Sequence, residues 1–117
     1  MPIDVLFAGI AVSDLQTATT WYDRLLGRPA DIIVNDDEVM WRIVEGAWIY
    51  LVRDPARAGQ ALVTLAVPDL EGAIAEIANR GLGLSPIETI EGAGWKATIL
   101  DPEGNQIAFI EVLSSPD

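Results

Sequence analysis

The sequence predicts an α+β fold built from two tandem βαβββ modules, which form a curved mixed sheet around a cleft. Half of the 117 residues are hydrophobic and 21% are charged, so the chain can bury a core. Residues 11–18 (Ala-Val-Ser-Asp-Leu-Gln-Thr-Ala) recur at 66–73 (Ala-Val-Pro-Asp-Leu-Glu-Gly-Ala) with five identities. An apolar run precedes each copy and a stretch of helical period follows it. This repeat favours a duplicated structural unit.

The first copy predicts one strand, one helix and three further strands. Leu6 to Val12 is a short apolar run that ends in turn residues, as buried strands do. Ser13 and Asp14 offer N-cap oxygens, and Gln16 is spaced for a capping box with Ser13. Gly27 ends the predicted helix. The three strand-like segments that follow are 31–35, 39–45 and 48–53.

The second copy repeats this order of elements. An apolar strand spans 61–67, Asp69 caps a helix, and Gly81 ends it. The strand-like segments that follow are 84–90, 95–100 and 106–113. The segment 53–59, which contains Pro55, is the one plausible linker, and it divides the chain into modules 1–57 and 58–117.

Composition excludes several classes of function. The chain has no His and no Cys, so it has no Ser-His-Asp triad, no imidazole or thiolate metal ligand and no disulfide. Its net charge of −11 and single lysine disfavour nucleic acid and anionic membranes. The same charge favours a neutral or cationic small molecule. No apolar run is long enough to cross a membrane and the start lacks a basic segment, so a cytoplasmic location is expected.

Alternation along the predicted strands separates a helix-facing set of residues from a cleft-facing set. One helix can cover only one face of each four-stranded unit, so the other face is expected to line a cleft. Aromatic side chains on that face would hold planar or cationic ligands by stacking and cation–π contact. The expected ligand-binding residues are Phe7, Trp41, Glu45, Trp48, Tyr50, Leu62, Thr64, Trp95, Ala108 and Ile110. Arg42 and Lys96 are expected to be solvated strand charges, with contact to an anionic ligand as the alternative.

Three motifs resemble those of the vicinal oxygen chelate superfamily, which includes glyoxalase I, extradiol dioxygenases, and fosfomycin- and bleomycin-resistance proteins. The motifs are Val12-Ser13-Asp14-Leu15, Trp21-Tyr22 in the first helix, and Asp101-Pro102-Glu103-Gly104-Asn105 before the last strand. The resemblance covers essentially the whole chain and implies the paired βαβββ fold. It also implies, for metal-dependent members, two ligands from each half, usually His and Glu.

The four ligand positions of the superfamily fall here on Phe7, Tyr50, Leu62 and Ala108. Of these four side chains, only that of Tyr50 has an oxygen that can coordinate iron. The resemblance therefore implies a metal-free member without catalytic residues or cofactor, similar to the bleomycin-resistance proteins. Those proteins are dimers that sequester a cationic, aromatic drug in clefts between subunits, so a homodimer and a role in antibiotic resistance are expected.

Two alternatives remain open from the sequence. One is a lyase, isomerase or dioxygenase of the same superfamily that uses carboxylates, or a metal in a shifted site, with Glu45, Glu88 and Glu111 as candidates. The other is a structural or regulatory subunit whose cleft is filled by Phe7 and Leu62.

Overall fold

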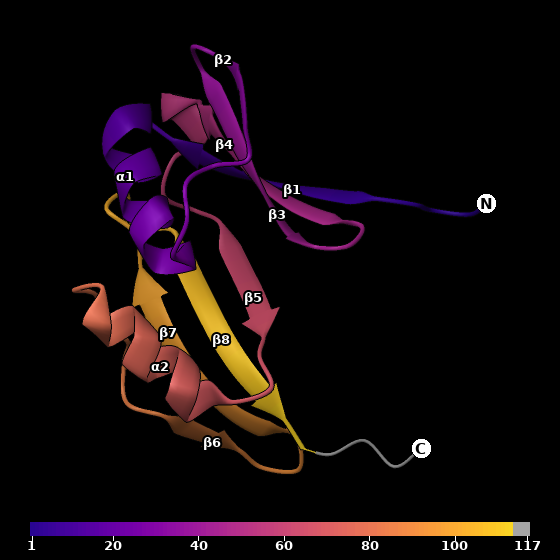
Figure 1. Ribbon diagram of the computed structural model, residues 1–117, viewed down its shortest axis with the longest axis vertical. Coiled ribbons are helices and arrows are strands. Elements are labelled where there is room, and N and C mark those ends of the chain that lie inside the picture. Colours follow the sequence, from indigo (N-terminus) through magenta and orange to yellow (C-terminus); the bar gives the residue numbers. More distant parts are fainter. Residues whose placement is uncertain (114–117) are drawn as a thin grey trace.

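A computed structural model describes residues 1–113 of the chain, and it confirms the predicted fold class (Figure 1). The first module contains β1 (Leu6–Val12), α1 (Leu15–Leu26), β2 (Ile32–Asn35), β3 (Glu38–Val44) and β4 (Ala47–Arg53). A 3-10 turn, η1 (Pro55–Arg57), leads to the second module. That module contains β5 (Leu62–Ala66), α2 (Leu70–Asn79), β6 (Glu88–Ile90), β7 (Gly94–Leu100) and β8 (Gln106–Val112).

Each module forms its own four-stranded mixed sheet, with strand orders β1-β4-β3-β2 and β5-β8-β7-β6. β1 pairs with β4 and β5 pairs with β8 in parallel, whereas the remaining neighbours are antiparallel. Both helices lie on the left-hand side of the molecule in Figure 1. β1 and β5 are edge strands, so each keeps one side of its backbone unpaired within residues 1–113. No helix in this range is long and apolar enough to span a membrane.

The helix-covered face of each sheet carries the core. In the first module Ile10, Val12, Ile49 and Leu51 are all at most 4% exposed, and they pack beneath α1. In the second module Ala97, Ile107 and Phe109 lie with Leu70 and Ile77 of α2 in the same buried cluster. The alternation along β1, β4 and β8 therefore follows the prediction, with every second side chain turned toward a helix.

The helices begin where the sequence predicts, but one predicted capping contact of α1 does not form. Asp14 caps α1, because its Oδ1 accepts the Thr17 N–H at 3.1 Å. The expected capping box is wrong: the Ser13 hydroxyl instead donates to the Glu103 carboxylate at 2.6 Å. Gly27 ends α1 with φ of 77°, a left-handed conformation that glycine adopts at little cost.

One predicted strand is shorter than expected. The segment 84–90 was expected to be a strand, but only Glu88–Ile90 pairs regularly with β7. Pro86 has no N–H to give to the ladder, so regular pairing cannot continue through it. Ser85 still bonds to Thr98 of β7: its N–H donates to the Thr98 carbonyl at 2.8 Å, and its hydroxyl oxygen accepts the Thr98 N–H at 2.9 Å.

A turn of the second module, Asp101–Asn105, fastens the two modules together. The buried Asp101 carboxylate accepts the Tyr22 hydroxyl of α1 at 2.7 Å. Burial, reinforced by that hydrogen bond, raises the pKa of Tyr22, so the phenol remains a donor. Asn105, fully buried, donates to the Ala11 carbonyl at 3.1 Å. Each of these bonds crosses from one module to the other.

Two further contacts strengthen this junction. The Glu103 carboxylate accepts the Ser13 hydroxyl and the Asp14 N–H, the latter at 3.0 Å. These bonds hold the pKa of Glu103 below its ordinary value, the Ser13 hydroxyl contributing most. At the other end of α1, the Arg80 guanidinium donates to the Leu25 carbonyl at 2.8 Å and so caps this helix from the second module.

Candidate ligand-binding site

The face of the first sheet that α1 leaves uncovered, termed here the first open face, carries a stacked aromatic pair. The register of β1 and β4 sets Phe7 opposite Trp48. Their ring centroids are 6.1 Å apart and the planes differ by 23°. Phe7 is 52% exposed although it is a large apolar side chain. The pair therefore offers solvent-accessible aromatic surface on which a flat molecule can lie.

Tyr50 adds a third ring to the first open face, and Gly9 determines where that ring lies. The two residues are partners in the β1–β4 ladder. A Cβ atom at position 9 would fall 2.4 Å from the Tyr50 Cζ atom, so only glycine lets the ring lie over β1. β3 completes the surface with Met40 opposite Tyr50 and Arg42 opposite Trp48. Neither β3 residue was among the expected ligand-binding set.

The corresponding face of the second sheet, termed the second open face, carries aliphatic and polar side chains. Leu62 is 80% exposed at the start of β5, and Thr64 is opposite Ala108 in β8. Ile110 follows two residues later on the same face, opposite Ala66. Within the described strands this face has no aromatic side chain, although it contains four of the expected ligand-binding residues: Leu62, Thr64, Ala108 and Ile110.

An apolar hollow of about 330 Å³ lies where the first sheet meets the edge strand β5. It brings two of the expected residues together from different modules, Trp48 from β4 and Thr64 from β5. Leu6, Val44 and Leu65 also line it. The hollow carries no charged side chain, which suits an apolar ligand or the surface of another subunit.

Trp41 does not belong to the open face, and the expectation that it joins Trp48 there is wrong. Its partner in β4 is Ile49, and both side chains are buried beneath α1. The indole N–H of Trp41 donates to the Arg28 carbonyl at 3.2 Å, and its ring lies 6.0 Å from that of Tyr22. The cause is a register irregularity between Arg42 and Val44. One extra residue in a strand moves the preceding side chains to the opposite face.

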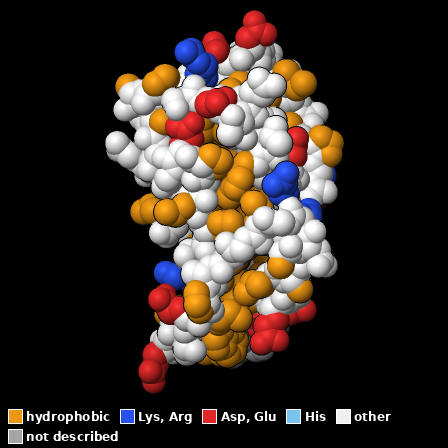
Figure 2. All heavy atoms as spheres, turned by 90° about the vertical axis from the view of Figure 1, so that its left-hand side faces the viewer, with side chains coloured by type: hydrophobic (Ala, Val, Ile, Leu, Met, Phe, Trp, Pro, Cys, Tyr) orange, Lys and Arg blue, Asp and Glu red, His pale blue; other side chains and the backbone are white. Residues whose placement is uncertain are grey.

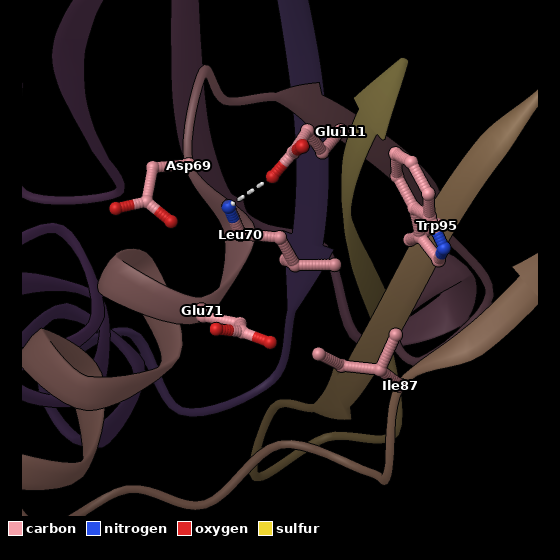
Figure 3. A pocket seen from close by; sticks show the side chains of 6 residues that line it. All are labelled: Asp69, Leu70, Glu71, Ile87, Trp95 and Glu111. Atoms are coloured by element: carbon pink, nitrogen blue, oxygen red, sulfur yellow. Dashed lines mark hydrogen bonds between the residues drawn. The ribbon is translucent and has the colours of Figure 1, made fainter. Parts of the chain in front are cut away.

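Trp95 also lies on the helix side, so the expectation that it lines the same cleft is wrong. It is opposite Glu111 in the β7–β8 pair, and alternation puts it on the side of Phe109. Trp95 lines a separate hollow at the start of α2 (Figure 3). This hollow has a volume of about 420 Å³. The other residues that line this hollow are Asp69, Leu70, Glu71, Ile87 and Glu111.

Two of the three carboxylates that line this second hollow, those of Asp69 and Glu111, have structural partners. Glu111 accepts the Leu70 N–H at 2.8 Å, and Asp69 accepts the Gly72 N–H at 3.0 Å. Both bonds satisfy N–H groups in the first turn of α2. These groups have no carbonyl partner within the helix. The negative charges also offset the positive end of the helix dipole. Helix capping thus accounts for Asp69 and Glu111.

The carboxylates proposed for a shifted catalytic or metal site do not come together. Glu45 is exposed in the β3–β4 hairpin, Glu88 forms a salt bridge with Lys96 at 3.6 Å, and Glu111 caps α2. Residues 1–113 contain no group of three or more Asp, Glu, His or Cys side chains that could hold a metal ion.

The superfamily's own ligand positions do not fit a metal either. Phe7, Leu62 and Ala108 have no donor atom, and the Tyr50 ring lies against the backbone of β1 at Gly9. Phe7 and Leu62 are both more than half exposed, so neither side chain fills a cleft within the chain.

Comparison with solved structures finds this fold over nearly the whole chain. A glyoxalase/bleomycin resistance protein from Catenulispora acidiphila DSM 44928 is 39% identical and superposes with a TM-score of 0.87. The alignment covers 93% of this chain and 98% of that protein. No family model matches the chain, and no curated protein matches its sequence. At 39% identity over this length, the chain belongs to the glyoxalase/bleomycin resistance protein family, as its motifs predict.

More distant structures share the fold. An antibiotic-binding protein from Streptomyces sp. CB03234 is 21% identical with a TM-score of 0.75, covering 93% of this chain and 95% of that one. A bleomycin-binding protein in complex with bleomycin is 18% identical with a TM-score of 0.75, covering 92% and 98%. At these identities the likeness is one of fold.

Proposed function

We propose that the protein binds and sequesters a small organic molecule with a planar aromatic part, on the first open face. The observation that carries the proposal is the stack of the exposed Phe7 on the partly exposed Trp48, beside Tyr50, whose ring lies over Gly9. A flat ligand laid on these rings would remove apolar surface from water and gain stacking contact, about 0.5–1.5 kcal/mol per aromatic pair beyond the area buried.

Structures that share the fold support this class of ligand. One binds an antibiotic and another is a complex with bleomycin. Sequestration needs affinity and no chemical step, which is consistent with the residues at the superfamily's four metal-ligand positions: Phe7 and Tyr50 on the first open face, and Leu62 and Ala108 on the second. We therefore propose an antibiotic-resistance role by binding, without a metal, a cofactor or a catalytic residue.

The proposal includes a homodimer. β1 and β5 are edge strands of apolar sequence, and such edges invite pairing with another chain. Leu6 and Leu62, at the starts of these strands, are 62% and 80% exposed. In the proposed dimer the first open face of one copy meets the second open face of its partner, so that a cleft between subunits encloses the ligand. Light scattering should then give a mass of twice 12.6 kDa.

The overall acidity gives no local support for a cationic ligand. The charged side chains on the open-face positions of the strands are two bases, Arg42 and Lys96, and two acids, Glu38 and Glu88. Acidic side chains gather instead at the top and bottom of the helix side (Figure 2). The preference for a neutral or cationic ligand therefore stays a prediction from net charge alone.

Calorimetric titration with bleomycin, an anthraquinone and a naphthalene carboxylate tests the proposal. We expect at least one saturable binding curve, and a loss of roughly tenfold or more in affinity for Trp48→Ala, because a central aromatic contact is removed. Trp95→Ala is the matched control, since Trp95 lies in the other hollow, and it should keep the affinity. Absence of binding across a broad panel of planar compounds would refute the proposal.

A further inference from the structure

A β-bulge directs Arg42 onto the first open face. The β3–β4 hairpin is closed by the pair Val44–Ala47, and a register shift separates it from the next pair, Arg42–Trp48. Without the shift, a regular hairpin would set Arg42 opposite Ile49, whose side chain is buried beneath α1. The shift that buries Trp41 is thus the same one that places an arginine among the exposed rings. Bulges commonly re-aim side chains in this way at functional sites.

The guanidinium of Arg42 is free to bind a ligand. The three salt bridges among residues 1–113 are Arg28–Asp31, Arg57–Asp54 and Lys96–Glu88, so Arg42 takes part in none. Its backbone is engaged, since its N–H donates to Asp31 at 2.7 Å and its carbonyl accepts a bond from Arg28. The exposed side chain keeps five N–H donors in a planar fork, a geometry that matches a carboxylate.

The nearby carboxylates do not neutralise Arg42. Asp31 already receives the Arg28 guanidinium at 2.8 Å as well as the Arg42 N–H. The Arg42 N–H is the largest cause of the lowered pKa of Asp31, and the charge of Arg42 adds a smaller effect. Glu38 lies at the other end of β3, opposite Val52. Among the strand positions of the first open face, Arg42 is therefore the one cation, and none of the salt bridges among residues 1–113 neutralises it.

We propose that the ligand is a planar aromatic acid, whose ring lies on Trp48 and Tyr50 and whose anionic group is bound by Arg42. Arg42 and Trp48 are directly opposite each other on neighbouring strands, which sets their Cβ atoms roughly 4.5–5.5 Å apart. A carboxylate attached to a ring on Trp48 can therefore reach the guanidinium fork. A cationic group at the same place would be repelled. This inference rests on the proposed function and names the ligand class of that same site.

Three probes with one ring system separate this inference from the proposed function: 2-naphthoate, 2-naphthamide and 2-naphthylmethylammonium. We expect the wild-type protein to bind the carboxylate roughly three- to tenfold more tightly than the amide, the range for an exposed charge-assisted pair. Arg42→Gln should abolish this preference, because it should lower the affinity for the carboxylate much more than the affinity for the amide. Arg42→Lys should keep part of it, because the charge remains but the planar fork is lost.

Arg24→Gln is the matched control, since Arg24 is exposed on α1, and it should bind all three probes as the wild type does. Near-ultraviolet circular dichroism confirms that each variant is folded. A preference for the ammonium compound, or a carboxylate preference that survives Arg42→Gln, would overturn the inference and leave the proposed function standing. Failure of all three probes to bind would count against both.

Discussion

The two modules share one topology and differ on their open faces. Their strand orders correspond one to one, and an Asp caps each helix at the equivalent position, Asp14 and Asp69. The first open face nevertheless carries aromatic rings and an arginine that forms no salt bridge within residues 1–113, whereas the second carries aliphatic and polar side chains and a lysine paired with Glu88. The repeat at residues 11–18 and 66–73 covers strand ends and helix starts. The shared residues thus lie where both modules have the same strand end and helix start, whereas the open faces differ at positions outside the repeat.

The largest expected effect distinguishes the two faces within the first module. Trp41→Ala should lower the free energy of unfolding by about 3–5 kcal/mol, because it leaves a cavity in the core and removes the indole hydrogen bond to Arg28. Trp48→Ala, on the open face, should cost about 1 kcal/mol or less. Urea unfolding measures both. Equal losses would contradict the assignment of the two tryptophans to opposite faces.

The next effect concerns the junction between the modules. Asp101→Ala should lower the free energy of unfolding by about 2–4 kcal/mol. The Tyr22 hydroxyl and two backbone N–H groups would lose the buried carboxylate that accepts their hydrogen bonds. Glu91→Ala, in an exposed turn of the same module, is the control and should change stability by no more than about 0.5 kcal/mol. If thermal unfolding of the two variants were indistinguishable, the turn would not be joining the modules.

A smaller effect tests how Gly9 positions Tyr50. Gly9→Ala should lower the free energy of unfolding by about 1–2 kcal/mol and weaken ligand binding, because the new methyl group collides with the Tyr50 ring. In a Tyr50→Ala background the same change should cost little, since the collision is gone. A double-mutant cycle measures this coupling. Additive effects would show that the ring does not lie over β1.

The smallest effect depends on pH. The pKa of Glu103 is lowered in the folded protein, so its stabilisation is present above the unfolded pKa and is lost as pH falls through the folded value. Ser13→Ala removes the main hydrogen bond and should cost a fraction of a kcal/mol at neutral pH, since the group is solvent-screened. The difference from wild type should shrink by about pH 3. A constant difference in unfolding free energy across this range would contradict the account.

The fold was largely predictable because it depends on local signals. Alternating apolar residues, helix caps and glycine turns fix the order of elements, and the observed strands lie within a few residues of the predicted ones. The predicted strand 84–90 is longer than the observed strand Glu88–Ile90, because Pro86 interrupts an otherwise strand-like sequence. The turn at Asp101–Asn105 carried a family signal, but its bonds to Tyr22 and Ala11 join residues far apart in the sequence and required the structure.

The site was only partly predictable because it depends on register. Phe7, Trp48 and Tyr50 lie on the open face as alternation along β1 and β4 indicates. A single bulge turns Trp41 toward α1 and Arg42 onto the first open face. The residue types in the segment 38–47 do not predict this bulge. Trp95 does not line the same cleft because, as the second residue of β7, it is turned toward α2. These are tertiary outcomes that local propensity does not determine.

The four indole N–H groups provide the most direct test of where a ligand binds. We expect the ¹⁵N–¹H signal of Trp48 to move most when 2-naphthoate is added, because its ring lies on the first open face. Trp41 is buried under α1 and Trp95 lies in a separate hollow, so their signals should stay in place. If the Trp95 signal moved and the Trp48 signal did not, the ligand would bind in the second hollow. That result would contradict binding on the first open face.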